Sequence, residues 1–347
     1  MAKYIEIAGR KIGPEENPVV IAEIGLNHNG SLEIAKSMVD AAKEAGIEII
    51  KHQTHIPEQE LSPLAKEIKM YNTDTTSLYE KLEKICLSEK DEQELKQYVE
   101  DKGMIFISAP FSFAAVDRLE KMNVKAYKIS SSQMNNYPLL EYVASTRKPI
   151  ILSTGMNDIE GVKKAVKTIQ KYHDEFALLH CTNIYPTPAD KIRLNALKEM
   201  KESFPGVVIG LSDHSLNNHS SYAALTLGAS IIERHFTDTR KRKGNDIPWS
   251  MTPSEAKELV EFANTINKMK AGKKEQLAEE KEIIEKNCFT VVTSRPIRKG
   301  SSITKEDLTT KGPNKSGIPA EDLYKVIWKK AVKNLDANYH LQWEDIE

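Results

Sequence analysis

Six residues suited to binding an anion are scattered through the chain, each within a short polar stretch. They are two lysines and four residues with hydroxyl or amide groups: Lys51, Lys128, Ser131, Ser153, Asn183 and Ser212. Ammonium groups and short donors that converge on one point can hold a phosphate or carboxylate, because charge-assisted hydrogen bonds are strong. One of the lysines could instead be an ion-pair partner between neighbouring segments, and the sequence leaves that alternative open.

Histidines form a second candidate group, since six of the nine lie in the same kind of stretch: His28, His52, His55, His180, His214 and His235. His214 and His235 could share a divalent cation, although pairing of histidine with aspartate, without a metal, is an open alternative. The coordination shell of such a cation could be completed, directly or through water, by carboxylates nearby: Glu23, Asp213, Glu233 and Asp246. Glu23 could act as a general acid or base, or hold a hydroxyl group; structural pairing with Lys51 is the alternative.

Motifs for several other chemistries are missing from the sequence. It contains no G-x-G-x-x-G, no Walker A motif and no G-x-S-x-G in a convincing context. No Cys–His or Ser–His dyad can be recognised from the sequence either. Nucleotide-dependent chemistry and acyl transfer therefore lack positive evidence.

The elements that must position these residues are eight short, apolar, β-branched runs that alternate with helical patterns. We predict strands at Val19–His28, Ile47–Thr54, Met104–Phe111, Ala126–Ser132, Pro149–Gly155, Phe176–Thr182, Val207–Ser215 and Ser230–Phe236. Segments with a 3.6-residue period lie between them, for example Leu32–Gly46 and Ile159–His173, and Gly46, Gly103 and Gly228 are placed as helix C-caps. Near-continuous apolar strands alternating with helices predict a parallel sheet that is buried on both faces.

Eight such units in about 220 residues predict an α/β fold of the (β/α)8 (TIM) barrel type. A doubly wound open sheet is the alternative, because periodicity does not show closure. The chemistry of such barrels lies at the C-terminal ends of the strands, where the candidate residues occur. We expect a barrel domain at residues 1–270, a charged helical linker at 271–287, and a small α+β module at 288–347 in which Thr304 and Asp307 have the spacing of a helix N-cap.

Composition excludes several classes of protein. The chain has 347 residues, with 49 Lys and Arg against 50 Asp and Glu, so its formal net charge is −1. This argues against binding to nucleic acid through bulk electrostatics. No apolar run is long enough to cross a membrane, and the N-terminus lacks the features of a signal peptide. Three cysteines without C-x-x-C spacing fit a reducing compartment, so we expect a cytoplasmic protein.

At its candidate residues the sequence resembles the sialic acid (N-acetylneuraminate, or nonulosonate) synthase family. The opening segment Ile21–Ser31 (IAEIGLNHNGS) is similar to the first signature of that family, and Ile50–His55 (IKHQTH) to its second. Further segments match in the same order: Leu152–Met156, Leu179–Pro188, Gly210–His214 and Glu233–Asp238. The tail, Ile297–Leu308, resembles the C-terminal antifreeze-like (SAF) module of the family. The similarity covers almost the whole chain from about residue 15.

The resemblance implies condensation of phosphoenolpyruvate with the open-chain aldehyde of an N-acetylated hexosamine, such as N-acetylmannosamine or a di-N-acetylated sugar. Water is consumed, phosphate leaves, and a nine-carbon α-keto acid sugar forms. It implies that phosphoenolpyruvate is held by the six anion-binding candidates and that Mn²⁺ or Mg²⁺ is held by His214 and His235. Glu23 matches a carboxylate that handles proton transfer or water. The acceptor sugar or metal-bound water is implied to contact Gln53, Asn72, Gln133, Tyr185, Glu233 and Asp246.

The family resemblance also implies a homodimer in which each antifreeze-like module caps the barrel mouth of the partner. The sequence departs from the family pattern at several substrate contacts. Gln133 replaces the usual glutamate of the fourth strand, Ala109 replaces a threonine, Phe113 replaces an arginine, and Gly312 replaces the arginine that usually precedes a proline. An amide at 133 adds a donor and removes a charge. The reaction type is thus better supported than the identity of the acceptor.

Two competing functions remain open from the sequence. The chain could be another metal-dependent barrel enzyme, either one that uses phosphoenolpyruvate or an aldolase. Such an enzyme would require further cations for a phosphorylated acceptor, and Arg234, Arg240 and Arg242 are available at the mouth. The chain could also be a family member that binds phosphoenolpyruvate without turning it over.

Overall fold

A computed structural model describes residues 4–68, 77–313 and 316–347 of the chain. Eight parallel strands form a closed barrel in the order β10-β3-β4-β5-β6-β7-β8-β9, so the predicted barrel is confirmed and the open sheet is excluded. The strands are β3 (Val19–Gly25), β4 (Ile49–Thr54), β5 (Ile105–Pro110), β6 (Tyr127–Ile129), β7 (Ile150–Ser153), β8 (Phe176–Cys181), β9 (Val208–Asp213) and β10 (Ile231–His235). Each lies within one of the eight predicted runs.

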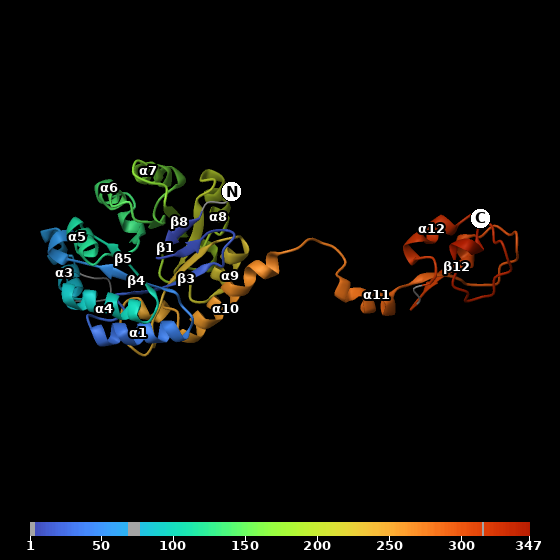
Figure 1. Cartoon of the computed structure of the whole chain (residues 1–347), viewed down its shortest axis with the longest axis horizontal. Helices are drawn as coiled ribbons and strands as arrows, with labels where there is room; N and C mark the ends of the chain where they lie inside the picture. The colour runs from blue at the N-terminus through green and yellow to red at the C-terminus, as the bar shows by residue number, and fades with distance from the viewer. Residues whose placement is uncertain (1–3, 69–76, 314–315) are drawn as a thin grey trace. The chain divides into compact units, whose positions relative to one another are not determined.

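Helices surround the barrel strands, as Figure 1 shows. The longer ones are α1 (Leu32–Glu44), α3 (Leu78–Ile85), α4 (Glu89–Asp101), α5 (Phe113–Lys121), α6 (Tyr137–Ser145), α7 (Ile159–Gln170), α8 (Asn195–Ser203), α9 (His219–Thr226) and α10 (Pro253–Lys270). Gly46, Gly103 and Gly228, the predicted C-caps, all have a positive φ, between 69° and 85°. Since glycine has no Cβ, this left-handed conformation lets each helix end and the chain turn into the next strand.

Two layers of apolar side chains hold the barrel together. Side chains on the outer face of the strands, such as Val20 and Ile50, pack against helix residues such as Met38 and Leu95. Side chains inside the barrel, such as Ile21 and Ile49, form a separate cluster. A hairpin of β1 (Ile5–Ile7) and β2 (Arg10–Ile12), which was not predicted from the sequence, contributes Ile5, Ile7 and Ile12 to that inner cluster. The barrel is therefore a filled core, not a pore.

The chain divides into two compact units, Met1–Ala271 and Gly272–Glu347. The second unit contains α11 (Lys281–Asn287), the antiparallel pair β11 (Thr290–Thr293) and β12 (Leu308–Lys311), α12 (Leu323–Val326) and its own apolar cluster. Thr304 and Asp307 form the predicted cap, since the backbone N–H of Thr304 donates to Asp307 Oδ2 at 2.7 Å. In the parts of the chain that the structure describes, no helix is long and apolar enough to cross a membrane.

The remaining short helices lie in loops. They are α2 (Pro57–Glu60) and the 3-10 helices η1 (Pro63–Lys66), η2 (Ser131–Gln133), η3 (Ala189–Lys191), η4 (Ile247–Trp249), η5 (Ala278–Glu280), η6 (Lys305–Asp307), η7 (Ala320–Asp322) and η8 (Trp343–Asp345). Two of them, η2 and η4, follow barrel strands β6 and β10. They belong to the loops at the C-terminal mouth.

Candidate active site

The two-residue period of a β-strand decides which candidate side chains enter the barrel. Lys51 follows the inward-facing Ile49 by two positions, Ser153 follows Ile151, and Glu233 follows Ile231. Successive side chains of a strand point to opposite faces. Polar side chains from different strands therefore form the next layer inside the barrel, between the apolar core and the C-terminal mouth.

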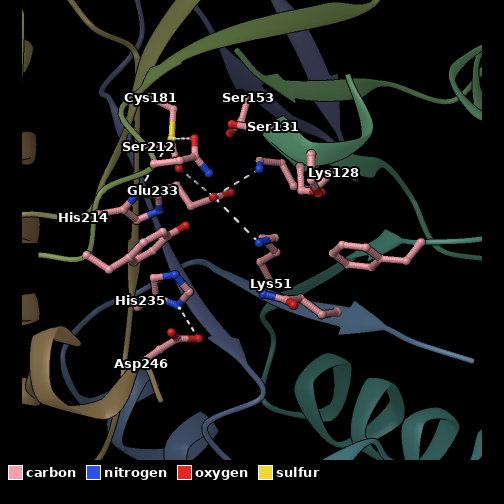
Figure 2. A pocket seen from close by; sticks show the side chains of 16 residues that line it. Lys51, Lys128, Ser131, Ser153, Cys181, Ser212, His214, Glu233, His235 and Asp246 are labelled. Atoms are coloured by element: carbon pink, nitrogen blue, oxygen red, sulfur yellow. Dashed lines mark hydrogen bonds and ion pairs between the residues drawn. The ribbon is translucent and has the colours of Figure 1, made fainter. Parts of the chain in front are cut away.

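These polar side chains line a cavity of about 220 Å³ at the mouth of the barrel (Figure 2). Twelve of the fifteen predicted site residues line it: Lys51, Gln53, Lys128, Ser131, Ser153, Asn183, Tyr185, Ser212, His214, Glu233, His235 and Asp246. The convergence predicted from separate strand ends is therefore observed. The particular roles that the sequence analysis assigned to these residues remain predictions.

Glu233 lies among the cationic groups of the cavity. Its Oε1 is 3.2 Å from Lys128 Nζ and 3.8 Å from Lys51 Nζ, and the hydroxyl of Ser212 donates to the same oxygen at 3.2 Å. Burial on its own would raise the pKa of Glu233, but the charges of Lys128 and Lys51 outweigh it and lower the pKa to about 2. Glu233 is therefore a carboxylate at neutral pH.

Lys51 lies between two carboxylates, because its ammonium group also pairs with Glu23. The alternative interpretation of Glu23, a structural pairing with Lys51, is thus what the contacts show. Burial is the main influence on Lys51 and lowers its pKa to about 7, while the charge of Glu233 acts in the opposite direction. An ammonium group whose pKa is near neutrality can change charge when an anion enters the cavity.

Two serine hydroxyls offer hydrogen-bonding capacity toward the cavity. Ser153 Oγ is buried and makes no hydrogen bond within the described residues. Ser131 Oγ accepts from the backbone N–H of Gly155 at 3.0 Å, and its side chain also forms a hydrogen bond with Cys181. A buried polar atom without a partner costs free energy, so Ser153 fits a ligand that accepts a hydrogen bond.

The side chains of His214 and His235 lie beside each other, with 5.5 Å between ring centroids. His214 Nδ1 is 2.9 Å from the carbonyl oxygen of Thr182. Because a carbonyl can only accept, Nδ1 carries the proton and Nε2 presents a lone pair. His235 Nδ1 is buried without a hydrogen-bond partner among the described residues and lies 3.9 Å from Asp246 Oδ2.

Neutral imidazoles are the form that binds metal ions. Burial, the largest influence, lowers the pKa of His235, although Asp246 acts in the opposite direction. No group of three or more His, Cys, Asp or Glu side chains in the described ranges is arranged to hold a metal ion. His214 and His235 would therefore supply two nitrogen ligands and leave the other positions to water or substrate.

Four of the six histidines placed at the mouth point elsewhere, which corrects the prediction that all six would gather there. His28 and His52 face the surrounding helices, with their Nε2 atoms 3.2 Å apart, and His52 Nδ1 lies 3.1 Å from Glu92 Oε1. His55 pairs with Glu60, and His180 donates to the carbonyl of Ile192 at 2.7 Å. For His52 and His180 the reason is the two-residue period of the strand, because His52 follows the outward-facing Ile50 and His180 follows the outward-facing Leu178.

Three predicted site residues do not line the cavity. Glu23 instead forms an ion pair with Lys51, and its Oε1 accepts from Gln53 Nε2 at 3.2 Å. Gln133 accepts from the side-chain amide of Asn136 at 2.9 Å. Asn72 lies outside the described residues. The expected contact of Gln133 with an acceptor sugar is thus not supported by its position in this structure.

Four cavity residues were not predicted: Phe111, Ser130, Ser132 and Cys181. Cys181 Sγ lies 3.9 Å from His214 Nδ1. The strand pattern contained the signal, because Cys181 follows the inward-facing Leu179 by two positions. The three others lie in the loops that follow β5 and β6, where the period of two no longer applies.

The three arginines that could have held a phosphorylated acceptor are engaged away from the cavity. Arg234 faces outward and donates to Asn218 Oδ1 at 2.5 Å and to the carbonyl of Ser215 at 2.6 Å. Arg240 and Arg242 pair with Glu255 and Asp238, both at 2.7 Å. None of the three lines the cavity. A second phosphate site built from these arginines is therefore not supported.

A closed (β/α)8 barrel with a polar, cation-bearing cavity at the C-terminal ends of its strands has the architecture of a barrel enzyme. The family comparison agrees: residues 38–275 match the model of the NeuB family, and residues 290–347 match that of the SAF domain. The chain belongs to the NeuB family, and the named proteins that match it include sugar-acid synthases. The resemblance stated from sequence motifs is confirmed.

Similar proteins cover nearly the whole chain. An uncharacterized protein of Methanocaldococcus jannaschii is 37% identical over 99% of this chain and 98% of its own length. The N,N'-diacetyllegionaminic acid synthase of Legionella pneumophila is 33% identical over 94% of each chain. The crystal structure of N-acetylneuraminic acid synthetase from Leptospira borgpetersenii, in complex with citrate, is 32% identical with a TM-score of 0.74, covering 82% of this chain and 96% of that one.

Proposed function

We propose that this protein condenses phosphoenolpyruvate with the open-chain aldehyde of an N-acetylated hexosamine, giving a nine-carbon α-keto acid sugar and inorganic phosphate. The observation that carries the proposal is the convergence of Lys51, Lys128, Ser153 and Ser212 on one buried point. Two ammonium groups and several hydroxyl donors are what a small molecule with both a carboxylate and a phosphate requires. Membership of a family of sugar-acid synthases supplies the reaction type.

In this reaction the methylene carbon of phosphoenolpyruvate forms a bond with the aldehyde carbon. The oxygen of one water molecule bonds to the carbon that carried the phosphate, and the bond from that carbon to the bridging oxygen breaks, so that phosphate leaves with the bridging oxygen and the electron pair of this bond. Of the two protons of water, one goes to the former aldehyde oxygen and the other to phosphate. The lysines hold the negative charge of the substrate and of the departing phosphate. Ser153 orients it, since its hydroxyl makes no hydrogen bond within the described residues, and Ser131 lines the same cavity.

A divalent cation, Mn²⁺ or Mg²⁺, fits the paired histidines. The buried, unpartnered Nδ1 of His235 and the lone pair that His214 presents at Nε2 are suitable ligands. The ion would polarise the carbonyl group of the sugar aldehyde, which needs open coordination positions. The ring of Tyr185 packs against that of His214, with 4.1 Å between centroids and a tilt of 31°. Burial raises the pKa of the Tyr185 phenol, so Tyr185 offers a neutral hydroxyl group to the sugar.

The role of Glu23 follows from its contacts. It pairs with Lys51 and accepts from Gln53, both of which line the cavity. We propose that Glu23 orients these two side chains and exchanges protons with the cavity through Lys51. The predicted direct proton transfer to substrate would require Glu23 to move.

The acceptor is expected to lie on the side of the cavity lined by Gln53, Tyr185 and Asp246. Similar proteins make different products, N,N'-diacetyllegionaminic acid in one case and N-acetylneuraminic acid in another. The departures at Ala109, Phe113 and Gly312 lead us to expect an acceptor other than plain N-acetylmannosamine. We also expect this acceptor to carry no phosphate group, because the three arginines that could bind one are engaged with other residues outside the cavity.

The test is a phosphate-release assay with phosphoenolpyruvate, Mn²⁺ and a panel of sugars, followed by mass spectrometry of the product. The panel contains N-acetylmannosamine, 2,4-diacetamido-2,4,6-trideoxyhexoses, mannose and a 6-phosphorylated N-acetylmannosamine. We expect release with a di-N-acetylated sugar and little with mannose. No release with any sugar would contradict the proposed reaction; binding of phosphoenolpyruvate in the same preparation would then indicate a binding protein without turnover.

The proposed homodimer, with one module covering the barrel of the other chain, is tested separately by light scattering and by mixing chains. A monomeric mass at assay concentration would contradict it. Mixing a chain that lacks residues 288–347 with a full chain that carries a cavity mutation should restore activity if the module acts on its partner.

A further inference from the structure

Glu233 occupies the centre of the donors that the proposed function assigns to phosphoenolpyruvate. Lys128, Lys51 and Ser212 all approach the same oxygen, Oε1, within 3.2 to 3.8 Å. The other oxygen, Oε2, is buried without a hydrogen-bond partner among the described residues. A carboxylate in this position has the geometry and charge of one end of the substrate (Figure 2).

The charges around this point are balanced, before any substrate enters, when Lys51 is protonated. Lys51 and Lys128 carry the positive charges, and Glu23 and Glu233 carry the negative ones. All four side chains are at least 95% buried. An anionic substrate that joined these four groups unchanged would add uncompensated negative charge to a buried cavity, which is costly.

Substrate and Glu233 therefore compete for the same donors. Of the three donors Lys51, Lys128 and Ser212, Glu23 contacts Lys51 and leaves the other two available, whereas Glu233 engages all three. Glu233 also has an open direction to move, because it and His235 lie on the same face of β10 and both line the cavity with Tyr185 and Asp246. That is the side expected to receive the acceptor sugar.

We propose that Glu233 is a positioning residue that holds the two lysines until phosphoenolpyruvate displaces it, and that its displaced carboxylate then completes the acceptor site. The inference rests on the proposed function and adds a binding order to it. Phosphoenolpyruvate must bind first, because until then the carboxylate that would accept hydrogen bonds from sugar hydroxyls is engaged with the lysines. Glu233 acts as an internal substitute for the first substrate.

A second role for Glu233 gives the opposite result in a binding experiment. If Glu233 served only to organise the two lysines, its removal would leave them misplaced and would weaken anion binding. If it competes with the substrate, its removal would strengthen binding while turnover falls. The sign of the change in affinity separates the two roles.

The experiment is calorimetric titration of phosphoenolpyruvate, without divalent metal, into the wild-type full chain and three variants. Glu233→Gln keeps the shape and removes the charge, whereas Glu233→Asp keeps the charge on a side chain too short to reach both lysines. Glu199→Gln is the control, because Glu199 is an exposed residue of α8. Circular dichroism and thermal melting establish that each variant is folded.

We expect Glu233→Gln to bind phosphoenolpyruvate about tenfold more tightly than wild type, since a competing charge-assisted contact has been removed. The affinity of Glu233→Asp for phosphoenolpyruvate should lie between those of wild type and Glu233→Gln, and the affinity of Glu199→Gln should equal that of wild type. Phosphoenolpyruvate should also raise the melting temperature of Glu233→Gln more than that of wild type, because the substrate then neutralises lysines that have lost their partner. Equal or weaker binding by Glu233→Gln would overturn the inference.

The binding order is measured with the panel sugar that gives the highest turnover. Titrated into wild type, this sugar should bind only when phosphoenolpyruvate is present, whereas prior binding of the sugar alone with equal affinity would overturn the order. The same preparations are assayed for phosphate release. Wild type that releases phosphate, combined with a Glu233→Gln variant that binds no more tightly, would refute the inference and leave the proposed function intact.

Discussion

The backbone carbonyl of Thr182 determines the tautomer of His214. It accepts from Nδ1 at 2.9 Å, which leaves Nε2 with a lone pair. The imidazole of His214, which follows β9, is thus held by the backbone of Thr182, which follows β8. The hydrogen bond from one strand end therefore fixes the orientation and tautomer of a candidate metal ligand, His214, on the neighbouring strand end.

Replacement of His235 by alanine should abolish metal-dependent phosphate release and leave the fold intact. His235 would supply one of only two nitrogen ligands, and its Nδ1 makes no hydrogen bond within the described residues whose loss would destabilise the barrel. Phosphate release with added Mn²⁺ and thermal melting measure the two effects. His219→Ala, at an exposed position of α9, is the control. Turnover at the wild-type rate in His235→Ala would refute the metal assignment.

Replacement of Lys128 by methionine should lower kcat/KM for phosphoenolpyruvate by about 100-fold, because a charge-assisted contact is lost and Glu233 loses its nearest cation. The variant should also melt at a lower temperature, since removing one partner leaves a buried charge less compensated. Lys148→Met is a matched control, because Lys148 pairs with Glu120 outside the cavity at 2.6 Å. Similar kinetics for the two variants would contradict the anion-binding role.

Binding of phosphoenolpyruvate should weaken as the pH rises above 7. Burial lowers the pKa of Lys51 to about 7, so the empty site progressively loses a positive charge above that pH. The dissociation constant should then rise, by up to about tenfold per pH unit, and binding near pH 8 should take up a proton. Calorimetry in two buffers with different ionisation enthalpies detects that proton. Lys51→Arg, whose guanidinium stays charged, should remove the uptake.

The free energy of unfolding should decrease as the pH falls from about 6.5 toward 3, in part because of His28. Burial, followed by the charge of His52, lowers the pKa of His28 to about 3. In this range the unfolded chain binds a proton that the folded chain excludes, so acidification favours unfolding by up to about 1.4 kcal/mol per pH unit. Denaturant unfolding of wild type and His28→Gln at several pH values measures the difference. Parallel pH profiles would contradict this assignment.

Much of the fold followed from the residue pattern. The eight apolar runs predicted the strands, and Gly46, Gly103 and Gly228 marked the ends of three helices. The hairpin Ile5–Ile12 was not recognised, since its short segments bury isoleucines only in the tertiary structure. Barrel closure could not be derived either, because the hydrogen bonds between β10 and β3 join residues more than 200 positions apart.

The residue types and their places at the strand ends, read from the sequence, were sufficient to predict an anion site from Lys51, Lys128 and the serines, and the family motifs indicated the reaction. The direction of each side chain required the folded barrel. Strand register sends Lys51 inward and His52 outward, although the two are adjacent. The pairing of Glu233 with both lysines likewise arises only when β4, β6 and β10 come together in one closed sheet. The spacing of apolar residues in the sequence shows the period of a single helix or strand. Charge compensation inside a barrel instead depends on distances between strands that are remote in the chain.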